Sequence, residues 1–102
     1  MSDLDPDLLR TFVAIADTGR FGAAAERVHR TQAAVSLQVR RLEDRAGAAL
    51  FRRQGRIMEL TEAGETLLGY ARRILEMNDA ALAAVRRGPM AGEVRFGTVQ
   101  DL

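Results

Sequence analysis

A chain of 102 residues, 47% of them hydrophobic, is long enough to bury the core of one small domain. The absence of cysteine excludes disulfides and thiol catalysis, and with no apolar run of membrane-spanning length and no signal-peptide pattern we expect a cytoplasmic protein. The net charge of +1 hides a basic block, because residues 27–56 carry eight arginines against two acidic residues, whereas the flanking segments are net negative.

The first third of the chain predicts two helices. Asp5 is a suitable N-cap, Pro6 suits the first helical position, and Gly19 is a plausible residue to end the helix. Apolar residues recur between them with helical spacing: Leu8, Leu9, Phe12, Val13, Ile15 and Ala16. A second helix, rich in alanine, should begin near Gly22.

A third helix is expected after a turn at residues 29–30, with Thr31 as its N-cap and Gly47 at its end. Four residues fall on one face and are predicted to be core: Val35, Val39, Leu42 and Ala46. The opposite face is expected to be exposed, and it carries Ala33, Leu37 and Arg40, with Ser36 and Arg41 at its flanks and Gln32 in the first turn. Two short helices around a tight turn, the second with such a face, are typical of a helix-turn-helix that enters the DNA major groove.

Residues 51–60 are too few for another packed helix and predict two short strands around a basic tip at residues 52–56. This hairpin would be the wing of a winged helix-turn-helix. Thr61 should then cap a long helix to about Arg87, ended by Gly88 and Pro89. A helix of roughly 26 residues spans about 39 Å, which is too long to pack only on a three-helix domain.

The long helix carries an apolar stripe at steps of four and three residues, with a border at steps of seven. This pattern predicts a coiled-coil-like seam with a partner helix. The seam residues are Leu67, Leu68, Ala71, Ile74, Leu75, Asn78, Ala81, Leu82 and Val85. The alternative is a long helix that folds back on its own domain. Residues 93–99 alternate and predict one strand, so the chain is expected to stop inside a second domain.

The motifs GRFGAAAERV, TQAAVSLQVRRLE, LFRRQGR and LTEAG follow one another in that order. Together they resemble the N-terminal domain of the LysR-type bacterial transcription regulators, over roughly residues 4–87. The resemblance implies a mainly α fold: a winged helix-turn-helix at 4–61, with the helix-turn-helix at about 21–40, and a linker and dimerisation helix at 62–87. Residues 88–102 would be a hinge and the first strand of a truncated effector-binding domain. Small-molecule control would require that missing domain, so this chain is expected to bind no cofactor, metal or effector.

In the family, residues matching Gln32, Ala33, Ser36 and Leu37 face base edges, and wing arginines lie near phosphate or the minor groove. The complete predicted DNA-binding set is Arg30, Thr31, Gln32, Ala33, Ser36, Leu37, Arg40, Arg41, Arg53 and Arg56. Arg20 and Gly22 depart from the family pattern, because small hydroxyl residues are common there, and we expect a weaker cap on the second helix. Leu37 replaces a residue that is commonly polar or basic, which changes the expected operator.

The prediction is a sequence-specific regulator that binds double-stranded DNA as a dimer, reading an inverted-repeat operator through the third helix and the wing. The resemblance also implies tetramers of the full-length protein. The alternative is a protein-interaction module built from the same elements, and the arginine block favours DNA. An enzyme is least expected: there is no nucleophile–base pair, no metal-ligand cluster and no phosphate-binding glycine loop, and His29 is the only histidine.

Overall fold

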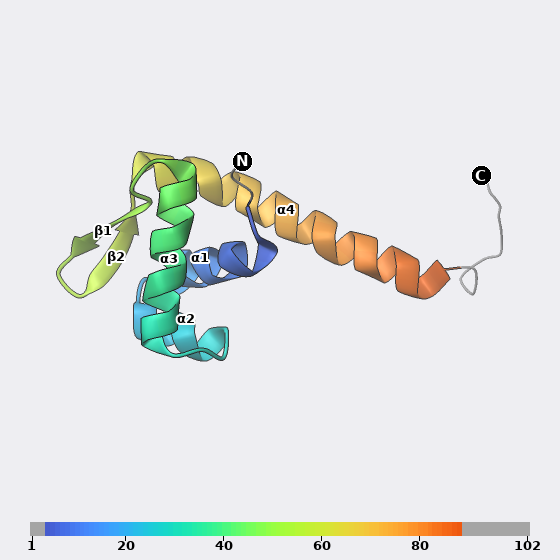
Figure 1. Cartoon of the computed structure of the whole chain (residues 1–102), viewed down its shortest axis with the longest axis horizontal. Helices are drawn as coiled ribbons and strands as arrows, with labels where there is room; N and C mark the ends of the chain where they lie inside the picture. The colour runs from blue at the N-terminus through green and yellow to red at the C-terminus, as the bar shows by residue number, and fades with distance from the viewer. Residues whose placement is uncertain (1–3, 89–102) are drawn as a thin grey trace.

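The computed structural model describes residues 4–88, which form four helices and one antiparallel two-stranded sheet (Figure 1). The elements are α1 (Pro6–Thr18), α2 (Phe21–Arg27), α3 (Gln32–Ala46), β1 (Phe51–Gln54), β2 (Ile57–Leu60) and α4 (Glu62–Arg87). The predicted class, a mainly α winged helix-turn-helix followed by a long helix, is confirmed. The strand predicted at residues 93–99 lies outside the described residues, as does Pro89.

The helix boundaries follow local capping signals. The Asp5 carboxylate accepts a hydrogen bond from the Asp7 backbone N–H at 2.9 Å, and the hydroxyls of Thr31 and Thr61 accept equivalent bonds at 3.1 and 3.0 Å. Gly19 ends α1 with φ 75° in the left-handed region that favours glycine. The start predicted near Gly22 for α2 is one residue late, and α2 has no side-chain cap, as its departures from the family pattern predicted.

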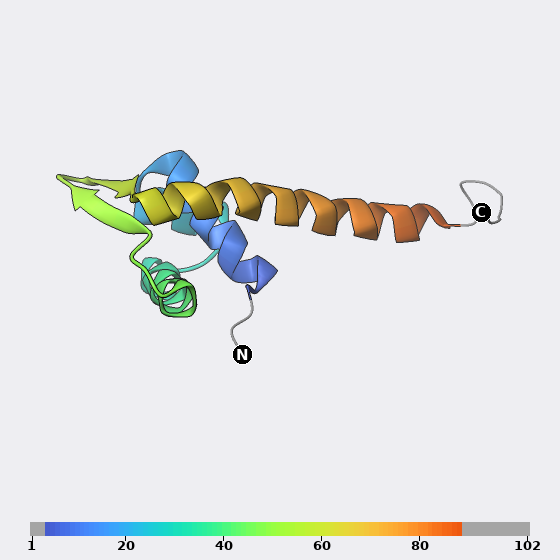
Figure 2. The ribbon, with the colours of Figure 1, turned by 90° about the horizontal axis from the view of Figure 1, so that it is seen from above.

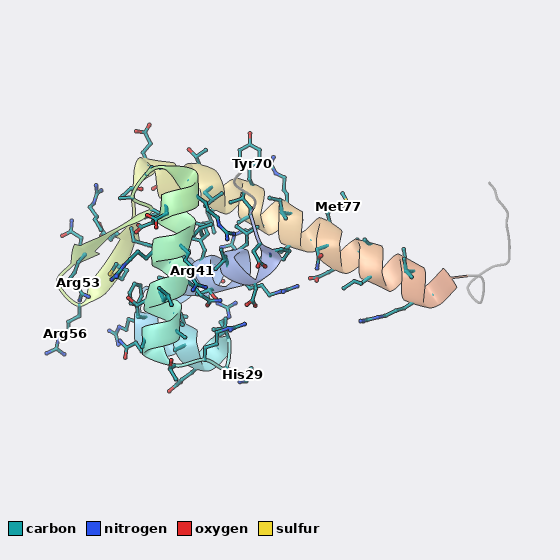
Figure 3. All side chains as sticks on the ribbon, viewed as in Figure 1. His29, Arg41, Arg53, Arg56, Tyr70 and Met77 are labelled. Carbon is teal, nitrogen blue, oxygen red and sulfur yellow. The ribbon has the colours of Figure 1, made fainter. Side chains whose placement is uncertain are left out.

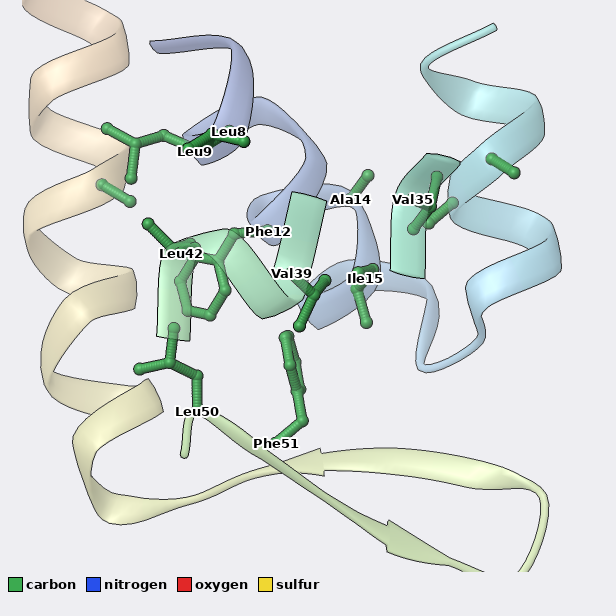
Figure 4. Close-up of a cluster of buried hydrophobic side chains, with 13 residues drawn as sticks. Leu8, Leu9, Phe12, Ala14, Ile15, Val35, Val39, Leu42, Leu50 and Phe51 are labelled. Carbon is green, nitrogen blue, oxygen red and sulfur yellow. The ribbon is translucent and has the colours of Figure 1, made fainter. Parts of the chain in front are cut away.

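The core lies where α1, α3, the wing and the start of α4 converge (Figure 4). Its largest fully buried side chains include Phe12, Leu9 and Ile15 from α1 and Leu42 from α3. The rings of Phe12 and Phe51 pack with their centroids 5.3 Å apart, which anchors the first residue of the wing on the helices. Ala46 was predicted to be core, but it is exposed because the last turn of α3 extends past the edge of the cluster.

The wing is a hairpin in which Phe51 pairs with Leu60 and Gln54 pairs with Ile57. Gly55 makes the turn with φ 62°, a conformation that other residues rarely adopt. The Met58 backbone N–H donates to the Gly19 carbonyl at 2.8 Å, so β2 is tied to the end of α1. The strands predicted around the basic tip are confirmed.

The long helix α4 has two halves with different surroundings. Its first half packs on α1, and its second half projects beyond the other elements (Figure 2). Ala71 is fully buried in the intrachain core, which corrects its assignment to an intermolecular seam, and Leu68 and Leu75 also pack against that core. The first half therefore does fold back on its own domain, because the helix carries a second apolar stripe that faces α1. None of the helices in residues 4–88 is long and apolar enough to cross a membrane.

Candidate nucleic-acid interface

The recognition helix α3 buries one face and presents the other to solvent. Val35, Val39 and Leu42 are buried as predicted, which fixes the rotation of the helix about its axis. The predicted contact residues lie on the remaining surface: Gln32, Ala33, Leu37, Arg40 and Arg41 are exposed, and Ser36 is half-buried. Leu37 retains 47% of its accessible surface, which leaves a large apolar side chain in water on this face.

A surface groove of about 290 Å³, the helix–wing groove, brings the start of α3 and the wing together. Its lining comes from the start of α2, the first turn of α3 and the hairpin: Arg20, Phe21, Gly22, Ala23, Gln32, Arg53, Arg56 and Met58. Figure 3 shows Arg53 and Arg56 at the far end of the wing. Gln32 and both wing arginines, which are more than twenty positions apart in the sequence, therefore line one concave surface.

The charge on this surface is not neutralised by carboxylates. The ion pairs within residues 4–88 join Arg27 and Arg72 to Asp17, Arg30 to Asp7, and Arg52 to Glu59. None of the arginines predicted on the recognition helix or in the helix–wing groove takes part in those pairs: Arg40, Arg41, Arg53 and Arg56. Guanidinium groups without a carboxylate partner produce a positive potential that attracts phosphate.

Two members of the predicted set have intramolecular roles. The Thr31 hydroxyl caps α3, so it positions the first turn of the helix rather than projecting from it. Arg30 donates to the Asp7 carboxylate, which also accepts a bond from Gln38 at 3.3 Å. These two bonds place Asp7 against both α3 and the turn that precedes it.

Sequence reasoning missed a buried polar pair behind the recognition helix. The Thr11 hydroxyl of α1 donates to the Gln38 side-chain oxygen at 2.7 Å, and both residues are buried. A buried hydrogen bond is directional, whereas the apolar contacts around it are not, so the pair restrains α3 against rotation on α1. Gln38 lies 60° from the buried Val35 on the helical wheel, which indicates that it faces the core. Its partner Thr11 cannot be predicted from the sequence, because the contact depends on how α1 and α3 pack.

The outer apolar face of α4, formed by Tyr70, Ile74, Met77, Ala81 and Val85, is largely exposed. Met77 and Val85 retain 70% and 77% of their surface, and Figure 3 shows Tyr70 and Met77 projecting from the same side of the helix. Beside it lies an apolar groove of about 420 Å³, lined by Leu4, Ala46, Ala48, Leu50, Ala63, Thr66, Leu67, Tyr70 and Ile74. Contiguous exposed apolar surface of this kind marks an interaction site. Tyr70 and Met77 were absent from the predicted seam.

Comparison with known proteins places this architecture in a family. Residues 6–65 match the family described as bacterial regulatory helix-turn-helix protein, lysR family. The chain therefore belongs to the lysR family of bacterial regulatory helix-turn-helix proteins, as the motifs predicted.

Individual relatives show the same likeness. The chain is 52% identical over 99 residues to the HTH-type transcriptional regulator PecT of Dickeya dadantii, an alignment that covers 97% of the chain and 31% of PecT. The crystal structure of a CbnR DNA-binding domain–DNA complex superposes with a TM-score of 0.77 at 37% identity, covering 81% of this chain and 95% of that one. Vibrio fischeri DarR in complex with DNA gives a TM-score of 0.81 at 30% identity, covering 88% of this chain and 31% of DarR. The chain thus spans about a third of the length of the curated relatives that it matches.

Proposed function

We propose that this chain is the DNA-reading part of a cytoplasmic transcription regulator that binds double-stranded DNA in a sequence-specific manner. The observation that carries the proposal is the helix–wing groove, in which Gln32 at the start of α3 and the wing residues Arg53 and Arg56 converge. A helix end with a side-chain amide suits base edges in the major groove, and arginines beside it suit the phosphate backbone. The similar proteins CbnR and DarR have been solved with DNA.

Within this proposal the residues divide by chemistry. The Gln32 amide can donate and accept together, which matches the N6 and N7 atoms of adenine, and Ser36 can bond a base or a phosphate. Leu37 and Ala33 are apolar and fit the thymine methyl group. Arg40, Arg41, Arg53 and Arg56 are assigned to phosphate or minor-groove contacts, which set position and affinity more than sequence. Arg30 contributes only after its bond to Asp7 is exchanged for one to DNA.

The proposed active form is a homodimer that reads an inverted repeat. The outer apolar face of α4 supplies the contact, together with the exposed Leu82, the half-buried Asn78, and Leu67 in the apolar groove. A twofold dimer presents two identical reading heads, each formed by residues 4–61, and therefore requires two half-sites in opposite orientation. We assign residues 62–87 to the linker helix and residues 88–102 to a hinge and the first strand of an effector domain. Effector binding and tetramer formation belong to that domain in this proposal, and no catalytic role is assigned.

Selection of bound sequences from a random double-stranded DNA pool tests the proposal directly. We expect an inverted repeat to be enriched, and Gln32→Ala should lose preference at one position in each half-site. The matched control is Gln54→Ala, which removes the same side chain from the tip of the wing and should leave the base preferences unchanged. Enrichment of no sequence, or no binding of DNA at low salt, would contradict the proposal and favour a protein-interaction module.

A further inference from the structure

A single carboxylate joins the helix-turn-helix to the linker helix. One oxygen of Asp17, at the end of α1, accepts a hydrogen bond from Arg72 of α4 at 2.7 Å, and the other accepts from Arg27 of α2 at 2.9 Å. Asp17 is the more shielded partner: its side chain retains 27% of its surface, against 48% and 51% for the arginines. Three helices therefore meet at one ionised group.

The position of this residue is not explained by the stability of α1. An acidic side chain in the last turn of a helix lies at the negative end of the helix dipole, where a basic residue is favoured. The two guanidinium groups compensate for that position. The Arg72 hydrogen bond, followed by that of Arg27, holds the pKa of the Asp17 carboxyl below its usual range, so the group is ionised at neutral pH.

The other side chains that pack α4 against α1 are apolar. Ala71 provides a small, fully buried contact, and Leu68 and Leu75 pack beside it. Packing of such side chains favours classes of crossing angle with a scatter of about 15–20° rather than one value. Charge-assisted hydrogen bonds from arginine have a defined geometry, which makes the Asp17–Arg72 pair the directional restraint between the two helices.

We propose that Asp17 is a positioning residue that sets the angle between α4 and the reading head, and through it the spacing of the half-sites that a dimer recognises. This inference rests on the proposed function, because it requires two reading heads joined through α4. The helix continues from Arg72 to Arg87, which is about 22 Å at 1.5 Å per residue. A rotation of about 10° at Asp17 would move the far end by about 4 Å, close to the ~3.4 Å rise of one base pair.

The test compares single half-sites with inverted repeats whose spacer is lengthened or shortened one base pair at a time. The 102-residue chain is used, with Asp17→Asn, Arg72→Gln and the double variant. Asp79→Asn is the matched control, since it removes the same charge from α4 and takes part in none of the ion pairs within residues 4–88. Thermal unfolding at one protein concentration verifies that each variant is folded, and Arg72→Gln supplies the answer if Asp17→Asn fails to fold.

We expect both single variants to bind an isolated half-site like the wild type. Their preference for the best spacer over its neighbours should fall by roughly fivefold or more, the lower end of a typical coupling between two sites. The double variant should add nothing further to the effect of Asp17→Asn, because that change already removes the carboxylate that Arg72 bonds. A wild-type spacer profile in both single variants would overturn the inference. If the wild-type chain shows no spacer preference, the proposed dimer is wrong and this inference fails with it. If the wild type shows a preference and both single variants keep it, only this inference fails.

Discussion

Gly64 is the one glycine in α4 whose missing side chain is required by packing. A Cβ atom built at this position would lie 2.2 Å from the Leu50 carbonyl oxygen and 2.9 Å from a methyl carbon of Leu60. The carbonyl is backbone, and it accepts a hydrogen bond from the Thr61 N–H at 3.0 Å, so it cannot move without disturbing the junction between the wing and α4. A Cβ atom built at Gly69, about one and a half turns later in α4, would have nothing within 4 Å.

The expected magnitude for Gly64→Ala follows from opposing terms. Forcing an extra methyl group into a packed site costs about 1–3 kcal/mol, and weakening the Leu50–Thr61 bond costs about 1 kcal/mol more. Alanine returns about 1 kcal/mol of helix propensity. The variant should be destabilised by roughly 1–3 kcal/mol, a fall in Tm of roughly 5–20 °C for a domain of this size. Gly69→Ala receives only the propensity gain, and its Tm should rise by a few degrees.

Calorimetry or circular dichroism at one fixed protein concentration measures both variants, because association through α4 would make Tm depend on concentration. Equal Tm values for Gly64→Ala and the wild type would refute the close approach of α4 to the wing. If Tm fell by a similar amount in Gly64→Ala and Gly69→Ala, the need for glycine would have a cause other than packing at residue 64.

Three further substitutions test separate parts of the structure. Thr31→Ala should cost about 1 kcal/mol in urea unfolding because the cap of α3 is lost, while Thr31→Ser retains it; equal stability of the two would contradict the cap. Leu37→Arg should barely change stability and should shift the selected sites towards guanine at one position per half-site, by roughly 1–3 kcal/mol; identical sites at equal affinity would make Leu37 a bystander. Ile74→Glu should give monomers in sedimentation with an unchanged helical spectrum, and a wild-type chain that is itself monomeric at high micromolar concentration would remove the outer face of α4 as an interface.

The parts of the fold that the sequence predicts are those with local causes. The caps at Asp5, Thr31 and Thr61 are threonine or aspartate residues followed by helical periodicity, and each accepts the expected backbone bond. The wing was predicted from its length and its basic tip alone. Exposure of Leu37 followed from the opposite position of Val35 on the same helix.

The features that the sequence does not predict depend on which helix faces pack against each other. Apolar spacing in α4 reveals two adjacent stripes, but not that Ala71 faces α1 while Tyr70 and Met77 face outwards. Likewise, a helical wheel gives the position of Gln38 without revealing Thr11 as its partner. Asp17 shows the same limit, since its two arginines come from helices that are 10 and 55 residues away in the chain.

Salt dependence of DNA binding is the most direct measurement of the central proposal, that α3 and the wing form a phosphate-contacting surface. The slope of log affinity against log salt should be steep in the wild type, and each phosphate contact contributes about 0.9 to it. Arg53→Ala together with Arg56→Ala should weaken binding to all sequences similarly and flatten the slope by up to about 1.8. Arg52→Ala is the matched control, because Arg52 alternates with Arg53 along β1 and lies within 4.0 Å of Glu59. A double variant that keeps the wild-type slope would contradict the account and remove the wing from the DNA interface.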